Sequence, residues 1–197
     1  MKNDAINTFK KHGGQLRMSD ALKLGINRYM LYSLRDLGII EQITRGVYRL
    51  AESPSLSMPD LSAVCSRYPR AVICLISALS FHNITTQIPH EISVALPRGS
   101  RKPKTDWPPI KVHLFSKDFY SLGIEEHIID GVTIKIYDPE KTLTDCFRFR
   151  NQIGLDVAIE ALKLYRERMK IDLIKLSHYT RQCKVEKIIQ PYLEAIV

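Results

Sequence analysis

The stretch DPEKTLTDC contains the charged side chains that most resemble a catalytic site, namely Asp138, Glu140, Lys141 and Asp145. Carboxylates close to a lysine can perform general acid–base chemistry. A structural interpretation explains them more simply, because Asp138 suits the N-cap of a helix and Glu140 suits its positively polarised first turn. Lys141 and Asp145 stand four residues apart, which is the spacing of an ion pair along one helix. We therefore expect these residues to stabilise a helix, and we predict no catalytic residue.

Other signatures of enzymes and metal sites are missing from the sequence. The six histidines lack the spacing of metal ligands, and neither a GxxxxGK[ST] loop nor a GxSxG motif occurs. Glu91 stands in a strand-like run, as in the core of a metal-dependent nuclease, but no strand with a Glu-x-Lys pattern follows it. The sequence predicts no metal and no cofactor, and it leaves a divergent nuclease or phosphotransferase as an alternative.

Arginine and tyrosine side chains near the N-terminus indicate a different chemistry, the binding of a polyanion. The chain of 197 residues has a formal net charge of +8, and residues 1–50 hold nine Lys or Arg against four Asp or Glu. Such a local surplus favours contact with nucleic acid. Six residues are candidates for contacts with double-stranded DNA: Arg28, Tyr29, Tyr32, Arg35, Arg45 and Arg49.

A winged helix-turn-helix would position these six side chains. The stretches KNDAINTFKK, MSDALKLG and INRYMLYSLRDLG predict three helices, the second capped by Ser19 and the third by Asn27. Apolar residues at helical spacing form the expected buried face of the third helix: Met30, Leu31, Leu34 and Leu37. EQITRGVYRL predicts a hairpin, because Gly46 can adopt positive φ between two β-prone runs. A lone hairpin is marginal in water, so it should pack on the helices as a wing.

The third helix is expected to enter the major groove of DNA, whose width admits a helix. Arg28 and Tyr29 lie in its first turn, where recognition helices contact bases. The other arginines suit phosphates, and Tyr32 suits either the backbone or a thymine methyl group. Because one small module makes few contacts, we expect two copies to pair on an inverted repeat. The alternative is a module that mediates protein contacts only.

The remaining sequence predicts a second domain. A stretch rich in serine and proline, residues 51–60, indicates a linker between a winged helix-turn-helix domain at residues 1–52 and an α+β domain at residues 57–197. The basic stretch RGSRKPK, residues 98–104, is expected to be a surface loop, with a second contact to nucleic acid as the alternative.

The α+β domain should contain a small, mostly antiparallel sheet followed by helices. Strand patterns cover residues 91–96 and 110–116, and a strand leading into a helix covers residues 71–83. Asp130-Gly131 between alternating runs indicates a further hairpin. Helical patterns then continue from Pro139 to the C-terminus.

The cysteines and the hydropathy pattern indicate the compartment. Four cysteines are scattered along the chain with no CxxC pair, which is typical of reduced thiols. The sequence has no signal-peptide pattern and no apolar run near eighteen residues. We expect a cytoplasmic protein without membrane contact.

Three stretches, in this order, resemble the AbiEi-type antitoxins, the repressor partners in type IV toxin–antitoxin systems of bacteria. They are GIIEQITRGVYRL, then ALSFHNITTQIPHEISVALPRG, and finally IKIYDPEKTLTDCFR followed by GLDVAIEALKLY. Together they extend from about residue 5 to about residue 170. The order of the three stretches carries the resemblance, since no single one is diagnostic.

The resemblance implies a division of labour between two domains. The winged helix would bind inverted repeats upstream of its own operon and repress it, using the six residues named above. The C-terminal domain would counteract a cognate nucleotidyltransferase-like toxin, without necessarily forming a stable complex with it. Such operons are linked to abortive infection, a form of phage defence. The alternative within the same architecture is a transcription regulator with a partner-sensing or degenerate nuclease-like C-terminal domain.

Overall fold

A computed structural model describes residues 2–53, 57–103, 105 and 107–196. Residues 54–56 of the predicted linker and Lys104 of the basic loop lie outside these ranges. The chain divides into two compact units, the first comprising residues 1–71, 104–108 and 126–134 and the second comprising residues 72–103, 109–125 and 135–197. The first unit thus reaches past residue 52, and the domain limits 1–52 and 57–197 stay a prediction.

The three predicted N-terminal helices are present as α1 (Lys2–Lys11), α2 (Met18–Lys23) and α3 (Arg28–Asp36). Asn27 caps α3 as predicted, but Ser19 does not cap α2. The chain enters α2 directly from a strand, so the extended residue Arg17 occupies the N-cap position and Ser19 already lies inside the helix.

The wing is a three-stranded antiparallel sheet with the order β1-β3-β2. Its strands are β1 (Gln15–Arg17), β2 (Ile40–Thr44) and β3 (Val47–Leu50). The hairpin of β2 and β3 was predicted, with Arg45 and Gly46 at its turn and a φ of 78° at the glycine. The short strand β1 was not predicted, because three residues carry too little alternation to identify a strand.

The winged helix has its own apolar core, which includes Phe9, Ala21, Leu31 and Leu34. The prediction that Leu37 belongs to the buried face is wrong, since this side chain is 56% exposed. The residue follows the last residue of α3 and serves as the C-cap, so it no longer shares the helical stripe.

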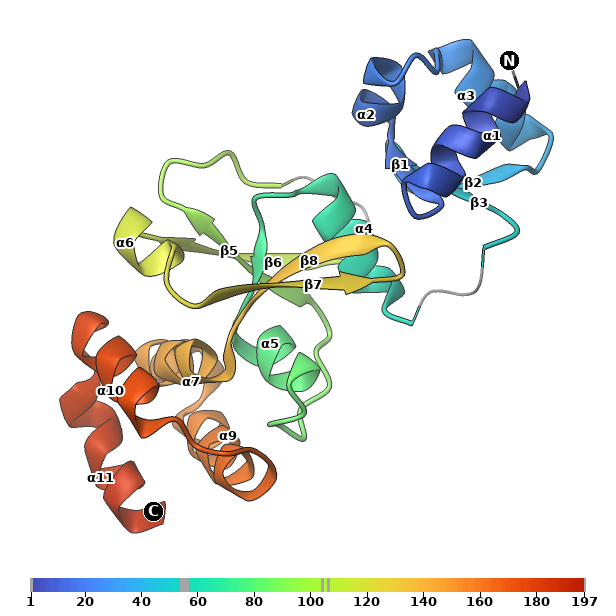
Figure 1. The fold of residues 1–197 in the computed structure, drawn as a ribbon. Helices are drawn as coiled ribbons and strands as arrows, with labels where there is room; N and C mark the ends of the chain where they lie inside the picture. Colours follow the sequence, from blue (N-terminus) through green and yellow to red (C-terminus); the bar gives the residue numbers. More distant parts are fainter. Residues whose placement is uncertain (1, 54–56, 104, 106, 197) are drawn as a thin grey trace. The chain divides into compact units, whose positions relative to one another are not determined.

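The second part of the chain begins with strands interspersed with helices and ends in a run of helices (Figure 1). The elements are α4 (Pro59–Arg67), β4 (Val72–Ile73), α5 (Leu75–Phe81), β5 (Ile92–Pro97), β6 (Ile110–Phe115), α6 (Lys117–Tyr120), β7 (Ile124–Ile129), β8 (Val132–Tyr137), α7 (Pro139–Arg148), α8 (Arg150–Ile153), α9 (Leu155–Arg168), α10 (Leu173–Gln182) and α11 (Glu186–Ile196). The predicted α+β class is confirmed.

The second sheet has five strands in the order β6-β5-β4-β8-β7 and is mixed, which corrects the prediction of a mostly antiparallel sheet. β4 pairs with β5 antiparallel, whereas β4 with β8 and β5 with β6 are parallel. Strand patterns in a sequence do not reveal which strands become neighbours. The crossover that makes β8 a neighbour of β4 spans more than fifty residues, and only the tertiary structure fixes it.

Helices α5, α7, α9, α10 and α11 gather on one side of this sheet (Figure 1). Helix α7 is central among them, because it contacts α5, α9, α10 and α11. The core beneath includes Phe115, Tyr137, Phe147, Leu162 and Tyr165, each at most 1% exposed. Within the part of the chain that the structure describes, no helix has the length and hydropathy needed to cross a bilayer.

Candidate functional site

The exposed side of α3 carries four of the six predicted DNA-contacting residues. The side-chain oxygen of Asn27 accepts a hydrogen bond from the backbone N–H of Met30 at 2.8 Å, which fixes the first turn of the helix. Leu31 and Leu34 are fully buried in the core of the winged helix and fix the orientation of α3. The opposite stripe therefore faces solvent, with Arg28, Tyr29, Tyr32 and Arg35 all exposed.

Tyr29, Tyr32 and Arg35 expose two aromatic rings and a guanidinium group on the solvent side of α3. Tyr29 is 82% exposed and Tyr32 is 41% exposed, so neither belongs to the core. The Arg35 guanidinium lies 5.2 Å from the centroid of the Tyr32 ring. It also donates hydrogen bonds to the Asp36 carboxylate, the shorter at 2.8 Å. Arg35 is thus held beside Tyr32 by two contacts on one helix face.

The two arginines of the hairpin have different environments. Arg45 is exposed at the turn, where Gly46 reverses the chain. Arg49 is only 7% exposed, and its guanidinium lies 3.9 Å from the Glu41 carboxylate on the neighbouring strand. Arg49 is thus set apart from the other five predicted contacts, because a buried and paired arginine has less freedom to reach a phosphate. The DNA contacts of all six residues stay a prediction.

The charged residues of DPEKTLTDC form a buried network on α7. Asp138 caps the helix, accepting a hydrogen bond from the backbone N–H of Lys141 at 2.7 Å. The Lys141 ammonium donates to the Asp145 carboxylate, and both side chains are fully buried. The ammonium also lies 4.4 Å from the centroid of the Tyr137 ring. The predicted cap and the predicted i,i+4 pair are both confirmed.

Residues of two later helices complete this network. Tyr179 donates a hydrogen bond to Asp138 at 2.9 Å, and Tyr165 donates one to Glu140. The Lys175 ammonium lies 3.1 Å from the Asp138 carboxylate and 3.3 Å from that of Glu140. The network therefore ties α9 and α10 to the start of α7, a role that the sequence did not reveal.

Burial dominates the protonation chemistry of this network. Loss of water contact raises the pKa of Asp138, although the Lys141 N–H, Lys175 and Tyr179 oppose the shift. Loss of water contact also raises the pKa of Asp145, against the attraction of Lys141. Within the described residues, Oδ1 of Asp145 has no hydrogen-bond partner. The carboxylates are enclosed by protein, as expected of groups that join elements of a fold.

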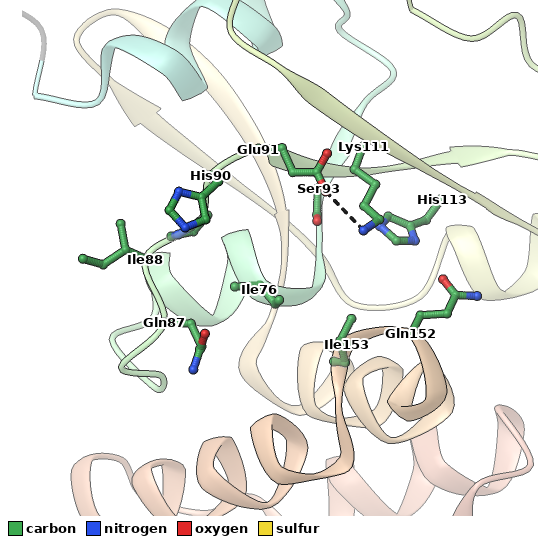
Figure 2. A pocket seen from close by; sticks show the side chains of 11 residues that line it. Ile76, Gln87, Ile88, His90, Glu91, Ser93, Lys111, His113, Gln152 and Ile153 are labelled. Carbon is green, nitrogen blue, oxygen red and sulfur yellow. Dashed lines mark ion pairs between the residues drawn. The ribbon is translucent and has the colours of Figure 1, made fainter.

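A pocket of about 230 Å³ opens elsewhere in the second unit, beside β5 and β6. Its polar lining includes His113, Ser93, Glu91 and Lys111, and Figure 2 shows these side chains around one hollow. From the sequence, Glu91 stood out only as a possible remnant of a nuclease, and no local signal marked His113 as part of a site. The alternation of IKVHLF could have indicated that His113 points inward, because it shares a strand face with the buried Phe115. Among the described residues, no group of three His, Cys, Asp or Glu side chains could hold a metal ion.

The comparisons with known proteins concern the N-terminal segment and the overall fold. Residues 3–51 match the family described as "Transcriptional regulator, AbiEi antitoxin". The curated proteins include no match. The crystal structure of the RV2827C protein from Mycobacterium tuberculosis is similar with a TM-score of 0.54 and 14% identity, over 85% of this chain and 66% of that chain. At this identity the similarity concerns the fold alone, and this chain spans less than two thirds of the length of that protein.

The matched segment runs from α1 to the end of the wing hairpin, with Arg28, Tyr29, Tyr32, Arg35, Arg45 and Arg49 inside it. It begins one residue after the start of α1 and ends one residue after β3. The resemblance inferred from the sequence is therefore confirmed for the N-terminal segment, which matches the family of AbiEi antitoxin transcriptional regulators.

Proposed function

We propose that this protein binds operator DNA through its winged helix and represses the operon that encodes it. The observation that carries the proposal is the solvent-facing stripe of α3. Arg28, Tyr32 and Arg35 follow one another at intervals of four and three residues and therefore share one helix face. All three are exposed, and Leu31 and Leu34 anchor the opposite face. A rigid helix that presents arginine and tyrosine to solvent fits the major groove.

The wing and the local charge support the same docking. Arg45 at the hairpin tip can neutralise a phosphate while α3 reads base edges. The first fifty residues hold nine basic against four acidic side chains, which favours approach to DNA at low salt. Two copies on an inverted repeat would double the number of contacts, so we propose that the operator contains such a repeat.

A gel-shift assay with the DNA upstream of the coding sequence tests the proposal. The double variant Arg28→Ala/Arg45→Ala should lose specific binding, because one base contact and one phosphate contact disappear on each copy. The control Arg166→Ala/Arg181→Ala removes two exposed arginines from α9 and α10 and should bind like the wild type. Undiminished binding by the first variant, with an intact circular dichroism spectrum, would refute the docking.

We further propose that the protein is the antitoxin of a type IV pair and counteracts a nucleotidyltransferase-like toxin through its C-terminal unit. The family description of the N-terminal segment supports this proposal. The assay is co-expression of the neighbouring reading frame with this chain, scored by growth. The variant Arg28→Ala/Arg45→Ala should lose operator binding and still restore growth, because the two functions use different parts of the chain. Rescue that disappears together with DNA binding would show that repression alone protects the cell.

A further inference from the structure

The pocket in the second unit is built from two parallel strands, two helices and one loop. Ser93 lies on β5 directly opposite Lys111 on β6, and His113 follows two residues later on the same face of β6. Ile76 of α5 and Ile153 of α8 form apolar parts of the wall. Figure 2 shows these side chains on different sides of one hollow of about 230 Å³. The floor is therefore regular secondary structure, which holds its side chains rigidly.

His113 is the polar group that the fold leaves unsatisfied in this pocket. The side chain is 5% exposed, and its ring packs edge-on against Phe149 with centroids 5.5 Å apart. Within the described residues, Nε2 of His113 has no hydrogen-bond partner. Buried polar atoms are nearly always paired, and an unpaired one costs about 1–3 kcal/mol. Because Nε2 is also closed to solvent, a ligand in the pocket would reach it only after the imidazole ring turns, and the new hydrogen bond would then remove this cost.

The charged side chains Glu91 and Lys111 of the pocket are paired with each other. Burial lowers the pKa of His113, and the nearby Lys111 lowers it further, so the imidazole is neutral and carries one donor and one acceptor. Glu91 and Lys111 lie 3.1 Å apart and neutralise each other at the rim. Ser93 and Gln152 add a hydroxyl and an amide, each able to donate and to accept. His113, Ser93 and Gln152 are thus uncharged groups that can both donate and accept hydrogen bonds.

We propose that this pocket binds an uncharged planar ring with neighbouring hydrogen-bond donors and acceptors, the chemistry of a nucleobase. Ile76 and Ile153 offer apolar surface to the ring. A volume of about 230 Å³ lies below the range of roughly 300–1,000 Å³ that holds drug-sized ligands. One ring system therefore fits, and any phosphate group would remain outside. The ring belongs either to a free nucleoside or to an unpaired base of RNA.

Titration calorimetry on the full chain tests the proposal with adenosine, guanosine, cytidine and uridine as separate probes. A second arm uses an RNA hairpin with a single-stranded 3′ overhang and the same hairpin with a blunt end. Saturable binding of a nucleoside identifies a free ligand, and binding of the overhang alone identifies RNA. Absence of binding in both arms at millimolar nucleoside and at micromolar RNA would overturn the proposal.

Variants of His113 and Ser93 locate the binding. His113→Phe keeps an aromatic ring against Phe149 and removes Nε2, so affinity should fall at least tenfold. Ser93→Ala is the milder change and should lower the affinity severalfold. This second variant keeps the site testable if the His113→Phe protein does not fold. The matched control His178→Phe changes an exposed histidine on α10 and should bind like the wild type. Binding that is insensitive to both pocket variants would contradict the assigned site.

The charge balance at the rim provides an independent check. Lys111→Met should change the affinity for a nucleoside less than threefold, because the ring makes no ionic contact. A nucleoside monophosphate that binds more than tenfold tighter than its nucleoside, and loses this advantage in Lys111→Met, would show an anion site instead. Operator binding should be unaffected by His113→Phe. A failure of the proposed pocket and a failure of the proposed DNA binding can therefore be told apart.

Discussion

Asn27 and Met30 are joined by a hydrogen bond of 2.8 Å that closes the first turn of α3. The donor is a backbone N–H that would otherwise lack a partner within the helix, and the acceptor is the side-chain oxygen of the N-cap residue. Arg28 and Tyr29 lie between the two bonded residues. The same bond that begins the helix therefore also sets the direction of the two residues proposed to contact bases.

Asn27→Ala should weaken both the fold and DNA binding. Loss of an N-cap side chain costs about 1 kcal/mol of unfolding free energy. Operator affinity should fall severalfold, because Arg28 and Tyr29 would then sit on a frayed turn. Asn27→Ser keeps an acceptor oxygen and is the matched control. Urea denaturation and a gel shift on the same proteins give both values; equal stability of the alanine and serine variants would contradict the capping role.

Loss of Arg35 should affect DNA binding, whereas loss of Arg49 should affect the stability of the fold. Arg35 is exposed on α3, so Arg35→Ala should leave the melting temperature unchanged and lower the slope of log K against log salt by about one. Arg49 is a buried residue of the wing strand β3, so Arg49→Ala should lower the unfolding free energy by about 1–2 kcal/mol through lost packing. Binding isotherms at several salt concentrations and thermal melts separate the two. A reduced salt slope in Arg49→Ala with an unchanged melt would restore Arg49 as a phosphate contact.

Lys141→Met should destabilise the second unit strongly. Both members of the Lys141–Asp145 pair are fully buried, and removal of one partner leaves an unpaired carboxylate inside the protein. Such a loss typically costs about 3–5 kcal/mol. The double variant Lys141→Met/Asp145→Leu should recover most of that stability, because the pair is removed as a whole and neither partner is left unpaired. Denaturant unfolding of the two variants and of Asp145→Leu completes the cycle, and additive effects would rule out direct coupling.

Stability should fall in mild acid because of His113. Its pKa is lowered in the folded protein, first by burial and then by Lys111, from an ordinary value of 6.5. The unfolded chain therefore takes up a proton more readily than the folded chain. The stabilising contribution is complete above pH 6.5 and decreases as the pH falls through the lowered pKa of the folded state. Unfolding free energies of the wild type and of His113→Phe are measured between pH 8 and pH 5. The wild type should lose stability relative to His113→Phe as the pH falls, and parallel curves would disprove the contribution of His113.

The sequence by itself determined the elements whose signals are local. The cap at Asn27, the positive φ of Gly46 and the cap at Asp138 before Pro139 each depend on a few adjacent residues, and all three were predicted from their types and spacing. The order of helices and hairpin that identifies the N-terminal segment follows from such signals. The pair of Lys141 and Asp145 was predictable for the same reason, since both lie on one helix.

Only the tertiary structure decided which distant segments meet. The mixed sheet, the burial of Arg49 and the ties from Tyr165, Lys175 and Tyr179 to the start of α7 all join residues that no short window contains. The pocket arose in the same way, because the parallel pairing of β5 with β6 brings Ser93 next to Lys111 and puts His113 on the same face of β6. Backbone and capping preferences act over a few residues, whereas burial and strand pairing depend on the whole fold. That difference in range separates what the residues alone predicted from what had to be seen in three dimensions.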